Sequence, residues 1–406
     1  MEMAEKATQD LRAAKRNVAV LAAAQAILGS VAPMSISIGS LAGYQLLGPD
    51  KALATLPVTG YNLGVSFGAV LIAIVTRMAG RKLSFMLGAC SAALGGLVAV
   101  LSLYRENFWL FVVGLLMIGL SSGFTQKIRF AAADVSPPAF KAEAISWILA
   151  AGIVSAVLGP QLVIWLKDAM APITFAGTFV TLLPLMALAI VILSFVHLPV
   201  TQKVKGEVRE TGRPLLDIVL TPRFLTGLIC GISTYALMTF VMTGAPLAMV
   251  VGCGFTPGQA TLGIQWHVIA MFGPSFFTGK LIARYGAERI VGAGLLLLMA
   301  CALTAHAGIE LWNFWAALVL LGIGWNFGFI GATAIVASSY RPEEADKVQA
   351  FHDILLFSSV AIASFSSGKV FAAQGWTAIT FVIWPVTIVC LGLLVMQFYR
   401  GRQTAG

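Results

Sequence analysis

"FWLFVVGLLMIGLSSGFTQKIRFAAADVSPP" (residues 108–138) is an apolar run that continues past its first charged side chains, Lys127 and Arg129, and ends near Asp134. About 20 mainly apolar residues are enough for a helix to cross the hydrocarbon core of a bilayer. Charged side chains are costly at that depth, so those inside such a run need a structural or functional reason. The segment therefore predicts a membrane-spanning helix with a charged end of functional interest.

The whole chain repeats the composition of this segment. Its 406 residues are 59% hydrophobic and only 11% charged, whereas a soluble domain carries roughly 25% charged residues. So few charges cannot cover a water-facing surface, and the short alternating segments of a membrane barrel are not visible. The net charge of +9 would suggest a nucleic-acid partner in a soluble protein. In a membrane protein the positions of the charges matter more, and we expect no nucleic-acid binding.

The pattern of apolar segments predicts an all-α polytopic membrane protein with twelve transmembrane helices. The expected spans are residues 17–46, 52–76, 83–103, 107–133, 144–167, 172–197, 223–248, 258–283, 289–308, 311–338, 348–372 and 376–399.

Lys and Arg are unevenly divided between the two sides of the membrane that these spans would cross. Of the 26 basic residues, our assignment places 22 in the tails, in the loops that follow even-numbered spans, or at the adjoining span ends. The excess of Lys and Arg marks the cytoplasmic side, so both termini are expected in the cytoplasm. The polar start of the chain, "MEMAEKATQDLRAAKR", is typical of a tail before an uncleaved first span. We expect a multi-pass protein of a bacterial inner membrane.

The two halves of the chain resemble each other. "ATLP" at 54–57 corresponds to "ATLG" at 260–263, and Gly80 in "RMAGRK" to Gly286 in "RYGAER", both with an offset of 206 residues. "GF" at 123–124, with Pro137 following, recurs at 328–329, with Pro342 following. These matches predict two related six-helix halves, residues 1–198 and 223–406, joined by a cytoplasmic linker, residues 199–222.

This architecture resembles the major facilitator superfamily of secondary transporters, and the resemblance covers nearly the whole chain. The family pattern G-x-L-x-D-R-x-G-R-R, in the turn between spans two and three, is matched by "GKLIARYGAER" at 279–289 between spans eight and nine. Neither copy has the aspartate of the pattern: Ala283 and Arg77 stand in its place. The resemblance implies an inner-gate motif formed by Arg77, Gly80, Arg81, Gly279, Arg284 and Gly286.

Span five carries a partial match to a second family pattern, found mainly in proton-driven exporters. "AGIVSAVLGPQL" at 151–162 keeps Gly152 and the pair Gly159–Pro160, but Ser155 and Ala156 replace glycine. Small residues at this spacing also allow helices to approach closely. Close packing and a link to export therefore both remain open, and the match slightly favours export.

Few ionisable residues lie inside the expected spans, so those that do are candidates for proton coupling. Asp353 lies about one turn into span eleven beside His352, and both residue types can take up and release protons near neutral pH when partly buried. The alternative is that Asp353 pairs with a basic residue and only helps to close the gate. Asp134 and Glu143, at the cytoplasmic ends of spans four and five, complete the set.

Polar and aromatic residues within the spans are the candidates for substrate contact. Transporters of this type bind substrate near the midplane, between the halves. His267 lies at mid-span and corresponds to Tyr61 in the repeat. The full set is Gln25, Tyr61, Gln126, Arg129, Trp147, Tyr235, Thr239, Gln265, His267, Trp325 and Asn326. For each residue alone ordinary packing is the better interpretation; together they suggest a cavity with aromatic faces and little negative charge.

Lys127 and Arg129 have no charged counterpart in "GFIGATAIVASSYRP" at 328–342 before Arg341. On a regular helix these two side chains would project about 200° apart, because each residue turns the helix by about 100°. One would then face the cavity while the other reaches the interface by snorkelling. Arg129 is slightly favoured as the residue that faces the cavity.

The sequence thus favours a monomeric secondary active transporter that moves a small organic solute, with protons as the coupling ion and the lipid bilayer as its surroundings. No phosphate-binding loop is present, and neither a cofactor, a metal site nor enzyme activity is expected. Two alternatives remain: a non-transporting membrane assembly or delivery factor with the same fold, and a facilitator without ion coupling.

Overall fold

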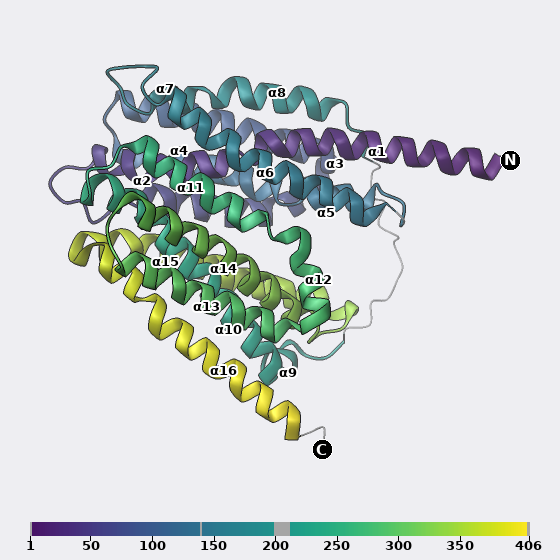
Figure 1. Cartoon of the computed structure of the whole chain (residues 1–406). Helices are drawn as coiled ribbons and strands as arrows, with labels where there is room; N and C mark the ends of the chain where they lie inside the picture. The colour runs from purple at the N-terminus through teal and green to yellow at the C-terminus, as the bar shows by residue number, and fades with distance from the viewer. Residues whose placement is uncertain (1, 139, 199–211, 404–406) are drawn as a thin grey trace. The chain divides into compact units, whose positions relative to one another are not determined.

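The computed structural model describes residues 2–138, 140–198 and 212–403. The chain divides into two compact units, Met1–Lys203 and Val204–Gly406. Residues 199–211, which make up most of the linker expected at 199–222, lie outside the described residues. Each unit is a helical bundle, and Figure 1 traces the helices of the first in purple to teal and those of the second in teal to yellow.

Within its described residues the first unit contains eight helices, and three predicted spans are each divided between two of them. They are α1 (Glu2–Leu28), α2 (Val31–Leu46), α3 (Leu56–Tyr104), α4 (Phe108–Thr125), α5 (Ile128–Asp134), α6 (Lys141–Leu166), α7 (Ala176–Val180) and α8 (Leu182–Ser194).

The second unit repeats this plan with additional short segments. Its elements are α9 (Leu215–Val219), α10 (Pro222–Leu247), the π-helix η1 (Ala248–Gly252), α11 (Pro257–Phe272), α12 (Ser275–Tyr285), α13 (Ala287–His306), α14 (Leu311–Ala337), the 3₁₀ turn η2 (Pro342–Glu344), α15 (Ala345–Phe381) and α16 (Ile383–Gln403).

Helix α3 covers two predicted spans, and the chain reverses between them. Gly80 has φ 81° and ψ 163°, a conformation that only glycine adopts readily. The helical stretches before and after it both pack on α4: a Cβ at Gly64 would meet the Leu116 carbonyl, and one at Gly95 the Gly114 carbonyl. Because both stretches contact one helix, Gly80 is the turn between two antiparallel helices.

Gly286 occupies the equivalent turn of the second unit, between α12 and α13. Its φ of 87° and ψ of 151° reproduce the backbone of Gly80 closely. The repeat offset of 206 residues therefore aligns two turns of the same unusual geometry, which supports the internal repeat predicted from the sequence.

Among the described residues, nine helical segments are long and apolar enough to cross a membrane. Two of them, Leu56–Tyr104 and Lys347–Tyr399, have 49 and 53 residues, about twice the length of one crossing. Each contains a glycine with positive φ, Gly80 or Gly375. The paired helices α11 and α12 match a further predicted span. This confirms an all-helical multi-pass membrane protein; twelve crossings, as an exact number, stay a prediction.

Three spans predicted as continuous are interrupted by two residues between helices in the structure. The breaks lie at Gly29–Ser30, at Gln126–Lys127 and at Gly273–Pro274. At the first, the Ser30 hydroxyl donates to the Ile27 carbonyl at 2.7 Å and competes with the helical ladder. At the third, Pro274 has no N–H to donate. Figure 1 shows α12 turning away from the axis of α11.

Candidate functional site

A cluster of three aromatic rings joins α10 to α14 in the second unit. Trp325 and Phe329 lie one turn apart on α14 and stack with centroids 5.2 Å apart and planes 18° apart. Tyr235 of α10 meets both edge-on, 5.4 Å from Trp325 and 5.0 Å from Phe329. Trp325 is 8% exposed, whereas Tyr235 and Phe329 are half-buried. The cluster is thus partly accessible and consists of neutral side chains.

The spacing of residues along α14 explains why these rings meet α10. Leu318, Gly322 and Asn326 follow each other at intervals of four and face α11. The Leu318 carbonyl bonds His267, and a Cβ at Gly322 would lie 2.5 Å from the His267 carbonyl. Trp325 and Phe329 occupy the neighbouring face, which contacts α10. Of the three residues, Tyr235 and Trp325 were predicted from the sequence as substrate-contact candidates. Phe329 was missed, although its position four residues after Trp325 places both on one face of the helix.

Asn326 braces the break between α11 and α12. Its Nδ2 donates to the Met271 carbonyl and to the Ser275 hydroxyl, both at 2.7 Å, and its Oδ1 accepts from the Thr278 hydroxyl at 2.6 Å. The side chain is fully buried. These bonds hold a bent helix in one geometry, and discontinuous helices are where transporters of this kind place their binding sites.

His267 is fully buried on α11, and its Nδ1 lies 2.8 Å from the Leu318 carbonyl. A carbonyl only accepts, so Nδ1 carries the proton and Nε2 is left as an acceptor. Among the described residues no group lies within hydrogen-bond distance of Nε2. Two further candidates are also buried, Gln265 at 7% exposure on the same helix and Thr239 at 2% on α10.

Candidates of the first unit form separate contacts within that unit. The Tyr61 hydroxyl donates to the Ser122 hydroxyl at 2.8 Å. Trp147 packs edge-on against Phe140, with centroids 5.8 Å apart. The Ser155 hydroxyl lies 3.0 Å from the Gln25 carbonyl, at the end of α1.

The small residues of span five allow this contact between α6 and the α1–α2 break. A Cβ at Gly159 would stand 2.3 Å from the Ser30 carbonyl. The structure therefore gives the partial span-five pattern a packing role, and its link to export stays a prediction.

Lys127 and Arg129 both approach one aromatic ring. Both cations lie over one ring, that of Phe130: Lys127 Nζ is 5.6 Å and the Arg129 guanidinium carbon 4.8 Å from its centroid. The helix is interrupted just before them, since α4 ends at Thr125 and α5 begins at Ile128, and the expected projection of the two side chains about 200° apart stays a prediction. Gln126 and Arg129 are exposed, and Arg129 as the cation that faces a cavity stays a prediction.

Around the turn at Gly80 in α3, two basic residues have identified partners. Arg81 Nη1 and Asp134 Oδ2 form an ion pair at 2.7 Å between α3 and the end of α5. Lys82 Nζ donates to the Ser194 carbonyl at 2.5 Å, whereas Arg77 is exposed. Asp134 also borders a hollow of about 370 Å³ that Asn17 and Ser136 help to line. This turn thus acquires an acid from span four, although its own copy of the motif has none.

In α12, just before the turn at Gly286, Gly279 and Arg284 are exposed, and the Arg284 guanidinium lies 5.3 Å from the centroid of the Tyr285 ring. Just beyond the turn, Glu288 of α13 pairs with Arg223 of α10 at 3.0 Å.

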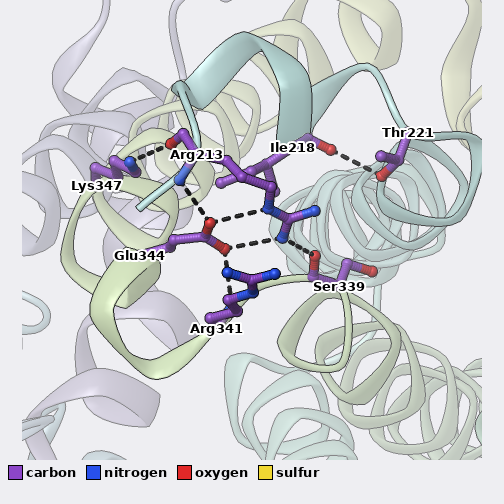
Figure 2. A network of polar contacts seen from close by, with 7 residues as sticks. All are labelled: Arg213, Ile218, Thr221, Ser339, Arg341, Glu344 and Lys347. Carbon is purple, nitrogen blue, oxygen red and sulfur yellow. Dashed lines mark hydrogen bonds and ion pairs between the residues drawn. The ribbon is translucent and has the colours of Figure 1, made fainter. Parts of the chain in front are cut away.

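A polar network of the second unit surrounds Glu344 and was not predicted (Figure 2). Glu344 Oε1 accepts from the Arg213 backbone N–H and from Arg213 Nε, both at 2.9 Å. Its Oε2 accepts from Arg213 Nη2 at 2.9 Å and from the Arg341 N–H at 2.8 Å. Arg213 also donates to the Ser339 carbonyl, and Lys347 Nζ donates to the Arg213 carbonyl. The network ties the segment before α9 to the connection between α14 and α15.

Glu344 is fully buried, and its partners keep it ionised. The hydrogen bonds from Arg213, followed by that from Arg341, hold the pKa of its carboxyl well below the ordinary value of 4.5. Nearby, α9 docks through Ile218 and Val219 into an apolar cluster with Phe224 and Val348. Packing and the ion pair therefore fix the same segment.

Asp353 and His352 lie on the first turns of α15. His352 Nδ1 and Asp353 Oδ1 are 3.2 Å apart, and the Asp353 side chain is 51% exposed. Glu143, in the first turn of α6, is exposed. The proton relay predicted for Asp353 requires a buried carboxyl group, and in this conformation the Asp353 side chain is half exposed. Its role in proton coupling therefore stays a prediction.

Two similar helical units, broken spans and glycine turns with matched geometry define a polytopic membrane protein of the secondary-transporter class. The profile of the Major Facilitator Superfamily matches residues 17–363, and the chain belongs to this family.

Curated relatives cover almost the whole chain. The riboflavin transporter RfnT of Brucella anthropi is 44% identical over 388 residues, which are 96% of this chain and 97% of that protein. The MFS-type transporter YdeG of Bacillus subtilis is 27% identical over 402 residues, 96% of this chain and 93% of that protein.

Solved structures show the same fold at low identity. The nucleoside transporter NupG superposes with a TM-score of 0.73 at 12% identity, covering 94% of this chain and 98% of that one. The human organic anion transporter MFSD10 superposes with a TM-score of 0.64 at 15% identity, covering 94% and 99%.

Proposed function

We propose that this protein is a secondary active transporter for riboflavin or a closely related flavin. The observation that carries the proposal is the 44% identity to a riboflavin transporter over nearly the full length of both chains. The likeness to nucleoside and organic anion transporters supports the fold alone.

The candidate substrate residues suit such a solute chemically. Riboflavin is uncharged at neutral pH and combines a planar heteroaromatic ring with a chain of hydroxyl groups. The aromatic cluster on α10 and α14 and the buried polar residues His267, Gln265 and Thr239 are neutral or able to be so. Aromatic faces bind planar rings, and a few placed hydrogen-bonding groups fix their orientation.

We further propose that transport is coupled to protons through Asp353 and His352, with Asp134 and Glu143 as additional candidates. The contact of 3.2 Å between His352 and Asp353 brings together two groups that can share a proton. Both termini are proposed to lie in the cytoplasm of a bacterial inner membrane, and the protein to act as a monomer. Export, slightly favoured from span five, is tested by measuring flux in both directions.

Uptake of riboflavin into vesicles that contain the purified protein tests this function. An imposed pH gradient should drive accumulation above the equilibrium level in the intact protein. Asp353→Asn should abolish the response to the gradient while riboflavin still equilibrates. Glu343→Gln, which removes an exposed acid just before α15, is the control and should respond as the intact protein does.

Each alternative has its own result in this assay. Riboflavin flux that is indifferent to the gradient and to Asp353→Asn would identify an uncoupled facilitator. Flux of neither riboflavin nor a broad panel of solutes would contradict transport and favour the assembly or delivery factor.

A further inference from the structure

Trp325, one of the three rings of the aromatic cluster, carries a donor without a partner among the described residues. Its Nε1 is buried, and no acceptor among the described residues lies within hydrogen-bond distance. A buried indole N–H ordinarily finds a partner, because leaving it unpaired forfeits its hydrogen bond to water. An orphaned donor beside half-buried rings is therefore suited to an acceptor from outside the chain.

Trp315, on the same helix, shows what a structural tryptophan does in this fold. Its Nε1 donates to the Gln259 carbonyl at 3.0 Å and so links α14 to α11. The side chain of each tryptophan has one polar atom, Nε1, and only that of Trp315 has a partner among the described residues. This difference makes Trp315 a matched control for Trp325.

Another ring pair of the unit, Phe314 and Trp376, does not share these features. Its centroids are 5.1 Å apart, but Phe314 is only 1% exposed and Trp376 9%. In the Trp325 cluster, by contrast, Tyr235 and Phe329 keep part of their surface accessible. That cluster therefore combines partly accessible aromatic rings with a buried indole N–H that no described residue accepts.

We propose that Tyr235, Trp325 and Phe329 form the surface on which the planar ring of the transported solute stacks, and that Trp325 Nε1 donates a hydrogen bond to a ring carbonyl. The inference rests on the proposed function and deepens it by placing the ring. The ligand it requires is a flat heteroaromatic ring with carbonyl acceptors at its edge, which the isoalloxazine ring of riboflavin is.

Asn326 and the break that it braces support this placement. Asn326 follows Trp325 directly and fixes α14 against the α11–α12 junction through Met271 and Ser275. The indole is thereby held on a helix whose rotation is fixed by three hydrogen bonds. A rigid support of this kind is what a stacking surface needs to bind a ring in one orientation.

The test compares Trp325→Phe with Trp315→Phe by titrating riboflavin against the purified full-length variants. Trp325→Phe keeps an aromatic face but loses the donor, and should weaken riboflavin binding by about 2- to 12-fold. Trp325→Leu also loses the face, and should weaken it by about 5- to 150-fold and reduce the quenching of flavin fluorescence that stacking produces.

Trp315→Phe should leave riboflavin affinity unchanged and should lower the melting temperature of the ligand-free protein more than Trp325→Phe, because only that variant deprives the Gln259 carbonyl of its donor. Lumiflavin, which keeps the ring without the hydroxylated chain, should lose affinity in the Trp325 variants in the same proportion as riboflavin. Ribitol, which lacks the ring, should not compete with lumiflavin for this surface.

The possible failures are distinguishable. If the intact protein neither binds nor transports riboflavin, the proposed function is wrong. If it transports riboflavin but Trp325→Phe binds it as tightly as Trp315→Phe does, the stacking site is wrong while the function stands. Should Trp325→Leu not fold, the comparison between the two phenylalanine variants decides the matter by itself.

Discussion

Glu344 shows how a single residue can matter without standing out in the sequence. It lies in "RPEEADK" beside Glu343, and nothing in the local sequence distinguishes the two glutamates. In the structure Glu343 is exposed, whereas Glu344 is fully buried and accepts four hydrogen bonds from Arg213 and Arg341. Only the fold brings Arg213, 131 residues earlier in the chain, to one of these neighbours.

Glu344→Gln should lower the melting temperature of the protein by several degrees. The variant replaces one acceptor oxygen with an NH₂ group that faces donors, and it removes the carboxylate that is hydrogen-bonded to the Arg213 guanidinium. Glu343→Gln is the matched control and should shift the melting temperature by less than about 2 °C. Equal shifts in the two variants would contradict the role assigned to Glu344.

The effect of Glu344 should also depend on pH in one direction. Its pKa is depressed in the folded protein, so its stabilisation is fully present above the unfolded value and is lost as the pH falls toward the folded value. The melting temperatures of the intact protein and of Glu344→Gln should therefore differ by a constant amount between pH 7 and pH 5. The difference should narrow below about pH 4.5, the ordinary carboxyl value. A difference in melting temperature that widens as the pH falls would contradict a depressed pKa for Glu344.

At the scale of the elements, the helices were largely predictable and their interruptions were not. Apolar length alone locates α6 and α14 to within a few residues of the predicted spans 144–167 and 311–338. The breaks at Gly29–Ser30 and Gln126–Lys127 depend on local hydrogen bonds that composition does not reveal. The second of these breaks includes Lys127 and lies two residues before Arg129.

Gly80→Ala and Gly286→Ala should each destabilise the protein by about 1–3 kcal/mol, because a Cβ is strained at the positive φ of these turns. A Cβ at Gly80 would meet no other atom within 4 Å, so the cost there is one of backbone conformation. Gly279→Ala is the control: it lies inside α12, its Cβ would also meet no atom, and the change should stabilise by about 0.5–1 kcal/mol. Chemical denaturation measures all three. Equal effects at positions 80 and 279 would show that the turn does not depend on glycine.

The candidate site was predicted in part, for physical reasons that differ from residue to residue. Tyr235 and Trp325 stood out as polar aromatics within apolar spans, and the structure brings them into contact. Asn326 stood out in the same way, but its amide groups turn out to be used within the fold. Whether a buried polar atom is engaged or free depends on its neighbours in space, so the sequence could nominate these residues but could not separate their roles.

For the whole molecule, the sequence predicted the class of protein from composition, the excess of basic residues on one side and the internal repeat. The family profile over residues 17–363 confirms that class. The solute could not be read from composition, because neutral aromatic and polar linings suit many organic molecules. The relative that is 44% identical supplies the flavin proposal, which only transport measurements can decide.

Counterflow of riboflavin in reconstituted vesicles tests the central claim most directly, because it requires alternating access to the solute and no particular coupling ion. Vesicles loaded with unlabelled riboflavin should transiently accumulate labelled riboflavin from outside, and excess external lumiflavin should compete. Protein-free vesicles give the background. Accumulation no greater than in those vesicles, with a protein shown by its melting transition to be folded, would contradict the account.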